Sequence, residues 1–341
     1  MVDVVFVTRR VDYLLFRTAY ASLQIGLKGA RRPIVVVPDR ELELYRGLGV
    51  DAVPESRLDR RLAVAKVHPW LKQQILKLCL HRVMQSDVAL VLDSDVLLCR
   101  KTAASSFSMK GRAPFYVEDP NGRAHTDWHG CSAEFLGLPP RHPVSYFPTP
   151  NFLHRTVLSR LHEHIAKRWC RDSVAVLMAH TREYTEWAAY GLFLQTLPDR
   201  DEFQVLRLAD HVAGIWEAED LERWDPGAQV KHGPPFAVVQ SSLRLPWMTL
   251  KSRLDRNVLL RRASTFSKPY AAWLVPKGTP MTTLAPGARR RGKSGTPSIA
   301  DKDKLFFGDS HPTEVDDTFV LFHLAKERRR VVVRRDAIIR A

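Results

Sequence analysis

The chain has 341 residues, of which 45% are hydrophobic and 26% charged, so it is long enough for one large α/β domain or two smaller ones with buried cores. The net charge of +15 suits nucleic-acid binders, proteins that rest on anionic membranes, and enzymes whose substrates carry phosphates. The charge is spread along the chain, which disfavours nucleic acid, and no apolar run approaches the roughly 18 residues of a membrane-spanning helix.

Short apolar runs alternate with amphipathic segments in the first third of the chain. This alternation predicts an α/β fold with a parallel sheet flanked by helices. The expected strands are 3–8, 33–39, 50–53 and 88–92, and the expected helices are 13–27, 41–48 and 69–85, the first capped by Asp12. Right-handed crossovers would bring the carboxyl ends of the strands, with Thr8 and Asp39, to one edge of the sheet.

Further elements follow at a looser spacing. The expected strands are 114–117, 144–147 and 236–242, and the expected helices are 127–137, 155–169, 182–194 and a basic helix 251–262. Residues 286–300 are rich in Arg, Gly and Ser and predict a basic flexible linker, although Gly287–Ser294 matches a phosphate-binding loop by chance. Residues 301–341 would form a C-terminal appendage of unknown role.

The Asp93-Ser94-Asp95 stretch directly follows the apolar run 88–92 and is the most informative motif. In an extended segment, residues i and i+2 share a face, so Asp93 and Asp95 would converge while Ser94 points away. Converging carboxylates repel one another unless a cation lies between them, which favours a hard divalent ion such as Mn²⁺ or Mg²⁺. The alternative is a strand that ends in a solvated turn.

Two helical segments carry polar residues that can join this motif. Gln73 and Lys77 lie one turn apart on the helix 69–85, on a different face from its apolar stripe. The segment 182–194 combines Glu186 with large aromatic side chains, and Thr185 or Thr181 could cap its helix. The alternative for Glu186 is a solvated residue in the first turn of an amphipathic helix.

These stretches together, in this order, resemble the bacterial DUF6492 family of GT-A-like proteins and, more broadly, nucleotide-sugar glycosyltransferases with a DXD motif. The resemblance covers about residues 3–250 and rests on 70–78, 90–95 and 184–191, with Trp128 and Gln240 in support. It implies that residues 1–285 form a nucleotide-sugar transferase domain with a GT-A-like α/β fold of the Rossmann type, whose sheet is mixed, mainly parallel and flanked by helices.

The resemblance also implies a role for each site residue. Asp93 and Asp95 would hold Mn²⁺ or Mg²⁺ at the diphosphate of the donor, a UDP-sugar in the simplest case, with Asp93 also reaching the ribose. Glu186 would face the acceptor and, in an inverting enzyme, deprotonate its hydroxyl, although Thr185 and Trp187 stand where the family more often has Ser and Tyr. The remaining residues are Thr8 and Asp39 at the nucleoside, Gln73 and Lys77 at the nucleotide sugar, His232 as a third metal ligand or a solvated turn residue, and His125, Trp128, His129 and Asn151 at a glycan or lipid-linked acceptor.

Two other functions remain open at this point. Asp93 could be the nucleophile of a haloacid-dehalogenase-like phosphatase, because an Asp-x-Asp after a strand opens those enzymes too. The basic charge could instead belong to a non-catalytic protein that binds nucleic acid or a membrane.

The four cysteines show neither a CxxC pair nor zinc-like spacing. Cys79 and Cys99 lie in apolar runs and are expected to be reduced core residues, which favours a reducing compartment. Arg9 and Arg10 have a faint likeness to a twin-arginine export signal, but a strand precedes them and Arg17 interrupts the apolar region. The expected location is the cytoplasm, with peripheral contact at the inner membrane face.

Overall fold

The computed structural model divides the chain into two compact units, Met1–Phe266 and Ser267–Ala341. The structure describes residues 2–107, 113–118, 126–139, 146, 149–180, 184–199, 203–230, 232–240, 247–265, 319–324 and 329–334. The expected boundary at 285, the linker 286–300 and the expected strand 144–147, apart from Tyr146, lie outside these residues.

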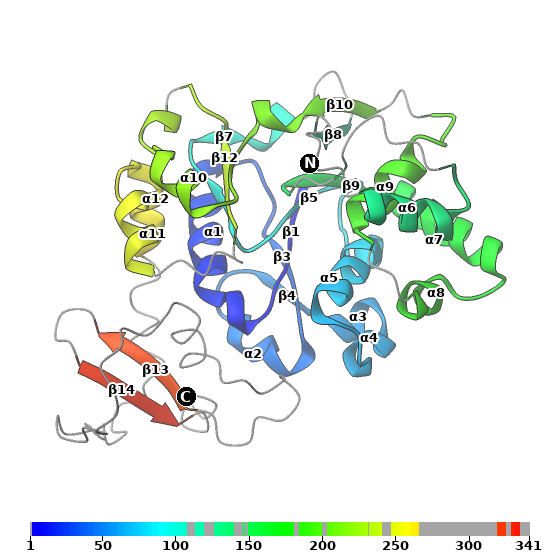
Figure 1. Cartoon of the computed structure of the whole chain (residues 1–341), viewed down its shortest axis with the longest axis horizontal. Helices are drawn as coiled ribbons and strands as arrows, with labels where there is room; N and C mark the ends of the chain where they lie inside the picture. Colours follow the sequence, from blue (N-terminus) through cyan, green and yellow to red (C-terminus); the bar gives the residue numbers. More distant parts are fainter. Residues whose placement is uncertain are drawn as a thin grey trace, which may run out of the picture. The chain divides into compact units, whose positions relative to one another are not determined.

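A five-stranded sheet forms the centre of the first unit (Figure 1). Its strand order is β4–β3–β1–β5–β9, with β1 Val2–Val7, β3 Ile34–Val37, β4 Asp51–Pro54, β5 Val88–Leu92 and β9 Asn151–His154. The first four strands are mutually parallel, and β9 pairs with β5 in the antiparallel sense. The mixed, mainly parallel α/β sheet expected from the sequence is therefore confirmed.

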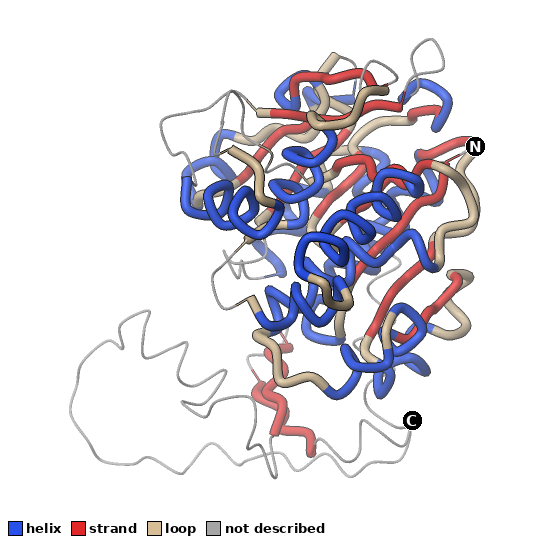
Figure 2. Tube along the Cα trace, turned by 90° about the vertical axis from the view of Figure 1, so that its right-hand side faces the viewer, coloured by secondary structure: helices blue, strands red, loops and turns tan. Residues whose placement is uncertain are grey.

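The central strands consist of branched apolar residues because both faces of the sheet are covered. All four residues of β3 are buried, as are five of the six in β1 and four of the five in β5. Figure 1 shows α1 (Tyr13–Gly26) and α5 (Pro69–Leu78) on opposite sides of these strands. Figure 2 shows the strands from the side, with helices lying across them.

Four further helices pack against α5 or against one another, and all but the first of them follow β9 in the chain. They are α6 (Thr126–Leu136), α7 (Arg155–Trp169), α8 (Ser173–Ala179) and α9 (Glu186–Leu194). Helix α9 packs against α5, α6 and α7 and is buried along its whole length. This burial explains why its sequence is apolar on every side rather than amphipathic.

Smaller sheets complete the two units. Strands β11 (Val212–Ile215), β12 (Phe236–Val239) and β6 (Val96–Leu98) form one sheet, in which β6 runs antiparallel to β12. The pairs β8 (Ala113–Val117) with β10 (Phe203–Arg207), and β2 (Leu27–Lys28) with β7 (Thr102–Ala103), are parallel. In the second unit, β13 (Phe319–Leu324) pairs antiparallel with β14 (Arg329–Arg334).

Several predicted boundaries were wrong for identifiable reasons. Helix α5 ends at Leu78 rather than near 85, because a 3₁₀ turn follows over Cys79–Arg82. The expected basic helix 251–262 is two helices, α11 (Trp247–Leu254) and α12 (Val258–Thr265). The buried side chain of Asn257 caps α12 by accepting hydrogen bonds from its second and third amides.

The expected helix 41–48 is reduced to α2 (Leu42–Tyr45), and Asp12 makes no side-chain cap for α1. Short remaining helices are α3 (Glu55–Leu58), α4 (Arg60–Val64) and α10 (Ala218–Arg223).

The expectation that Cys79 and Cys99 are reduced core residues is confirmed. All four cysteines are free thiols, and Cys79 and Cys99 are completely buried. Burial raises the pKa of the Cys79 thiol to about 12, so this thiol stays protonated and unreactive.

Within the described ranges, no helix combines the length and the apolarity needed to cross a membrane.

Candidate active site at the carboxyl edge of the main sheet

Polar residues gather where β1, β3 and β5 end at the same edge of the sheet. The backbone amide of Thr8 extends the β1–β3 pairing by donating to the Val36 carbonyl over 3.0 Å. The hydroxyl of Thr8 lies 2.6 Å from that of Ser94, so the ends of β1 and β5 are joined by their side chains. In open α/β sheets, this edge is where ligands bind.

The Asp93-Ser94-Asp95 motif is a turn rather than an extended segment. The Val96 amide donates to the Asp93 carbonyl over 3.1 Å, which closes a four-residue turn between β5 and β6. Ser94 was expected to point away, but it is buried and contacts Thr8. The i, i+2 argument for an extended segment therefore does not apply to Asp93 and Asp95.

Lys77 joins three separate elements in the centre of this edge. Its Nζ lies 2.8 Å from Oδ1 of Asp93, at the end of β5, and 2.6 Å from Oε1 of Glu186, at the start of α9. The side chains of Lys77 and Glu186 are each only 2% exposed, whereas that of Asp93 is 27% exposed. This cluster, named here the Lys77 cluster, comprises Lys77, Asp93 and Glu186.

Burial and charge act in opposite directions within the Lys77 cluster. Burial alone would lower the pKa of Lys77, but the adjacent carboxylates of Asp93 and Glu186 outweigh it and raise that pKa above its usual value. Burial raises the pKa of Glu186, although Lys77 opposes this shift. Oε2 of Glu186 is buried and has no hydrogen-bond partner among the described residues. A ligand hydroxyl could satisfy this oxygen, which is costly to bury alone.

Local structure explains why Glu186 can be held in this position. Thr185 caps α9 by accepting a hydrogen bond from the Ala188 amide over 3.0 Å, as one of the two predicted caps. A carboxylate in the first turn is favoured by the helix dipole, which partly offsets its burial. The neighbouring Trp187 ring lies 5.6 Å from Nζ of Lys77, close enough for a cation–π contact. The alternative of a solvated Glu186 is wrong.

Gln73 aligns α5 with the ends of two strands. Its Nε2 donates to the Val7 carbonyl over 3.0 Å and to Oδ1 of Asp93 over 3.2 Å. Gln73 and Lys77 were expected one turn apart on a shared face of this helix, and both side chains do reach Asp93. Gln73 lies in the second turn of α5 and Lys77 in its last turn, and both side chains reach the carboxyl end of β5 from there.

The other residues expected at the donor or at a metal, Asp39, Asp95 and His232, are not members of the Lys77 cluster. Asp39 is exposed at the same edge, and its Oδ2 accepts from the Ser56 amide over 3.1 Å. Asp95 is 5% exposed, and its carbonyl accepts from the Val239 amide over 3.0 Å. His232 is exposed in a turn before β12, and the structure does not bring it to the two carboxylates.

The donor set suits a hard cation only in part. Carboxylate oxygens are the ligands that Mn²⁺ and Mg²⁺ prefer, and the turn between β5 and β6 carries two carboxylates, those of Asp93 and Asp95. Asp93 already contacts Lys77, and across the described ranges no group of three or more His, Cys, Asp or Glu side chains could hold a metal ion. A cation would rely on one or two carboxylates together with substrate phosphates and water, which is the usual manner of Mg²⁺.

The expected acceptor residues have different surroundings. Asn151 is fully buried, and its amide bonds both the Tyr116 amide and the Tyr116 carbonyl, so it links β8 to β9 rather than facing a ligand. His129 is also buried, against the Tyr146 ring. Trp128 is partly exposed and packs against Trp70. His125 lies outside the described residues.

Sequence reasoning overlooked Ser94 and Trp187 as parts of this edge. For Ser94, the signal was a small polar residue close to the end of an apolar run, which is equally typical of a solvated turn. For Trp187, the signal was an indole adjacent to Glu186 in an otherwise apolar helix. Neither signal identifies the residue that is contacted, because Thr8, the partner of Ser94, and Lys77, the partner of Trp187, are both distant in the sequence.

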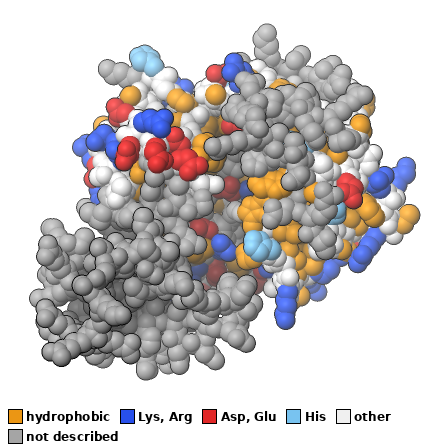
Figure 3. Space-filling model, viewed as in Figure 1, with side chains coloured by type: hydrophobic (Ala, Val, Ile, Leu, Met, Phe, Trp, Pro, Cys, Tyr) orange, Lys and Arg blue, Asp and Glu red, His pale blue; other side chains and the backbone are white. Residues whose placement is uncertain are grey.

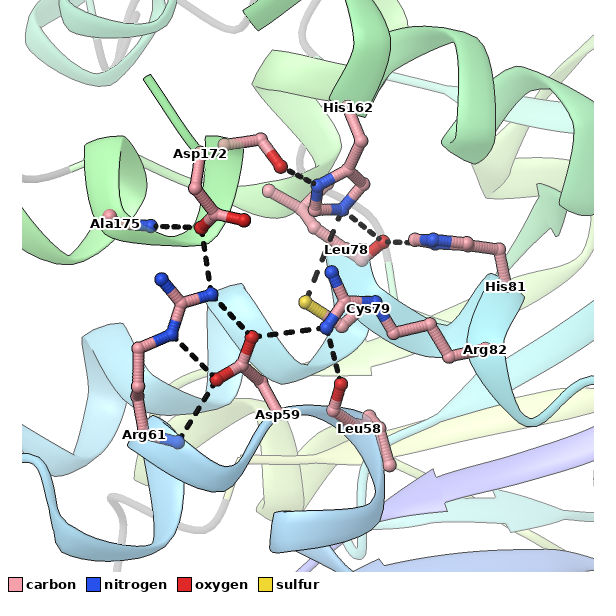
Figure 4. Close-up of polar contacts among 11 residues, drawn as sticks. Leu58, Asp59, Arg61, Leu78, Cys79, His81, Arg82, His162, Asp172 and Ala175 are labelled. Carbon is pink, nitrogen blue, oxygen red and sulfur yellow. Dashed lines mark hydrogen bonds and ion pairs between the residues drawn. The ribbon is translucent and has the colours of Figure 1, made fainter. Parts of the chain in front are cut away.

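A second polar cluster has a structural role (Figure 4). Asp59 caps α4 through the Arg61 amide and accepts from the guanidinium groups of Arg61 and Arg82. Arg61 also contacts Asp172, which caps α8. Beside this network, His162 donates or accepts at Ser173 over 2.6 Å. Every one of these groups is used to join helices, so the cluster stabilises the fold.

Comparison with solved structures gives distant likenesses. Galactosyltransferase LgtC in complex with donor and acceptor sugar analogues is 12% identical, with 78% of this chain and 95% of that chain covered and a TM-score of 0.44. Mouse xyloside xylosyltransferase 1 is 14% identical, with 72% and 100% covered and a TM-score of 0.43. Glycosyltransferase GlyE of Streptococcus pneumoniae is 11% identical, with 80% and 63% covered and a TM-score of 0.38. Likeness at this level says nothing about what the present chain does.

Comparison of sequences identifies the family to which the chain belongs. No curated protein matches the chain. The model of a family of unknown function, DUF6492, matches residues 14–261, which include the whole Lys77 cluster. The match covers most of the chain, so the chain belongs to the DUF6492 family.

Proposed function

We propose that this protein transfers a sugar from a nucleotide-sugar donor, most simply a UDP-sugar, to a hydroxyl group of a glycan or lipid-linked acceptor. The observation that supports it is the Lys77 cluster, in which a buried ammonium group joins carboxylates from β5 and α9 at the carboxyl edge of a parallel sheet. Clusters that perturb pKa values at this edge are typical of active sites.

The acceptor side of the reaction would use Glu186. Its Oε1 is held by Lys77, which leaves the buried Oε2 to receive a hydrogen bond from the acceptor hydroxyl. The burial that raises the pKa of Glu186 makes it a stronger base than an exposed carboxylate. In an inverting reaction, Glu186 would take the hydroxyl proton as the acceptor oxygen attacks the sugar.

The donor side would use the ends of β1, β3 and β5. Asp93 is the most exposed member of the Lys77 cluster and could accept hydrogen bonds from ribose or sugar hydroxyls. Thr8 and Asp39, at neighbouring strand ends, would contact the nucleoside. Asp93 and Asp95 would hold Mn²⁺ or Mg²⁺, which would neutralise charge on the departing diphosphate.

The net charge of +15 is consistent with substrates or surfaces that carry phosphate. An anionic lipid-linked acceptor would bring the enzyme to the inner face of the membrane from the cytoplasm. Binding that depends only on this charge should fall steeply with salt. Binding at the Lys77 cluster should depend on specific residues instead, so the two contributions are separable.

A thermal-shift titration with nucleoside diphosphates, with and without Mn²⁺, tests the donor side. We expect UDP with Mn²⁺ to raise the melting temperature of the full chain, and Asp95→Ala to abolish the rise. Asp199→Ala, which removes a surface carboxylate paired with Arg160, is the matched control. Absence of stabilisation by every nucleoside diphosphate would contradict the proposal, and a stable adduct of beryllium fluoride at Asp93 would favour a phosphatase.

A further inference from the structure

A partly exposed aromatic pair joins α5, the helix that carries Lys77, to α6, and the proposed donor site does not use it. Trp70, in the first turn of α5, packs on Trp128, in the first turn of α6, with ring centroids 5.4 Å apart and planes tilted by 39°. Both side chains are partly exposed. Figure 3 shows hydrophobic side chains gathered over α5.

The position of Trp70 along α5 connects this pair to the candidate site. Trp70, Gln73 and Lys77 follow the i, i+3, i+7 spacing, which places them on one face of the helix. Gln73 and Lys77 both contact Asp93, so Trp70 lies one turn further out from the same edge. Seven residues of helix span about 10 Å, so one ligand can contact both the aromatic pair and the Lys77 cluster.

Both helix starts that carry the tryptophans are held by side-chain hydrogen bonds. Gln74 donates to the Trp70 carbonyl over 3.1 Å, and the Ser132 hydroxyl donates to the Trp128 carbonyl over 2.8 Å. Pro69 occupies the first helical position of α5 and restricts its backbone there. Helix α6 in turn packs on α9, which carries Glu186. The pair is therefore fixed relative to the carboxylate that would face the acceptor.

We propose that Trp70 and Trp128 form a platform for a sugar ring of the acceptor, an inference that rests on the proposed function. A pyranose ring exposes polarised C–H groups on one face, and these are attracted to the negative face of an aromatic ring. The hydroxyl groups at the ring edge then remain free to meet the carboxylates of the Lys77 cluster. An aromatic surface with a few convergent polar groups is the usual composition of a small-molecule site.

Saturation-transfer NMR on the full chain tests this platform with three probes: the methyl glycosides of galactose, glucose and mannose. We expect at least one glycoside to bind. Trp70→Ala and Trp128→Ala should each weaken it about tenfold, as the loss of one stacked ring implies. Trp70→Phe keeps an aromatic face and should stay within about threefold of the unmodified protein. Trp216→Ala, which removes an indole that is 41% exposed elsewhere, is the matched control.

The outcomes separate this inference from the proposed donor site. The Trp70→Ala and Trp128→Ala proteins should retain the UDP-dependent thermal shift, whereas Asp95→Ala should lose that shift and still bind the glycoside. Glycoside binding that is unchanged in both tryptophan variants, or absent for all three probes, overturns the platform. If UDP does not raise the melting temperature of the unmodified protein but glycoside binding still depends on the tryptophans, the donor site is overturned and the platform stands.

Discussion

Replacement of Lys77 by methionine should be strongly destabilising, because Lys77 is the only described cation in ion-pair contact with Glu186. Methionine fills a similar volume but leaves one fully buried carboxylate and one partly buried carboxylate without their counter-ion. Removal of one partner from a buried ion pair costs about 3–5 kcal/mol. For a unit of this size, that loss corresponds to a fall of about 10 °C in melting temperature.

Two further variants, one at Glu186 and one at both Lys77 and Glu186, show whether the lost stability comes from the unpaired carboxylate. Glu186→Gln leaves Lys77 paired with Asp93, so it should cost only about 1 kcal/mol. The double variant Lys77→Met/Glu186→Gln removes the buried charge together with its counter-ion. It should be more stable than Lys77→Met alone, with a coupling energy of about 2 kcal/mol.

The destabilisation by Lys77→Met should also depend on pH. Without the ammonium group, burial raises the pKa of Glu186 further, so the folded protein holds a proton that the unfolded chain releases above its ordinary pKa of 4.5. A group whose pKa is raised by folding loses stabilisation as the pH rises. The difference in stability between Lys77→Met and the unmodified protein should therefore be larger at pH 8 than at pH 5.

Urea unfolding followed by circular dichroism measures these differences as changes in the midpoint at constant slope. The predicted cost of the unpaired charge is refuted if Lys77→Met unfolds within about 1 kcal/mol of the unmodified protein at pH 8, since a buried ion pair cannot be broken at so small a cost. It is also refuted if the double variant is less stable than the two single variants predict together.

Three further predictions concern catalysis and stability. Glu186→Gln should reduce sugar transfer by at least about a hundredfold while the UDP-dependent thermal shift persists; equal loss of both would place Glu186 in donor binding instead. Burial lowers the pKa of His162 to about 4, with His81 adding to the shift, so the folded state resists protonation and stability should fall by up to about 3 kcal/mol as the pH drops from 6.5 to 4. His162→Gln should flatten this dependence, and an unaltered curve would count against it. The hydrogen bonds from Arg61 lower the pKa of Asp59, so Asp59→Asn should destabilise the fold by about 1–3 kcal/mol near pH 7, and the difference from the unmodified protein should shrink as the pH falls below 3.8. Equal destabilisation at low and neutral pH would show that charge is not the cause.

The buried strands could be predicted from the sequence because they need little information from elsewhere. β1, β3 and β5 are continuous apolar runs of branched residues, and such runs are stable only where both faces of a sheet are covered. The long helix α7 was predicted with its observed ends, 155 and 169, because its apolar stripe is regular.

The contacts of the candidate site could not be predicted in the same way. Lys77 and Glu186 are 109 residues apart, and a lysine on an amphipathic helix is ordinarily solvated. The sequence placed each residue on its helix but carried no signal for their ion pair. Asn151 was misinterpreted for a related reason, because the backbone groups of Tyr116 that it bonds belong to a strand far away in the sequence.

Turn geometry was a further obstacle at Asp93-Ser94-Asp95. Whether a strand continues or turns depends on the next pairing partner, and here β6 leaves the main sheet to pair with β12, more than 130 residues later. A local pattern of apolar residues on both sides of the motif is equally compatible with one long strand. The motif therefore predicted a polar strand end correctly. The alternative of a strand that ends in a turn holds for the backbone, but Ser94 and Asp95 are buried rather than solvated.

The sugar transfer proposed for the Lys77 cluster requires a nucleotide-linked donor. The most direct measurement is the release of UDP from UDP-glucose, UDP-galactose and UDP-N-acetylglucosamine by the full chain, followed by ³¹P NMR with Mn²⁺ and then with excess EDTA. We expect at least one donor to be consumed with Mn²⁺, little consumption with EDTA, and a large loss in Glu186→Gln and Asp95→Ala. Consumption that is equally fast in both variants, or no consumption of any donor, would contradict the account.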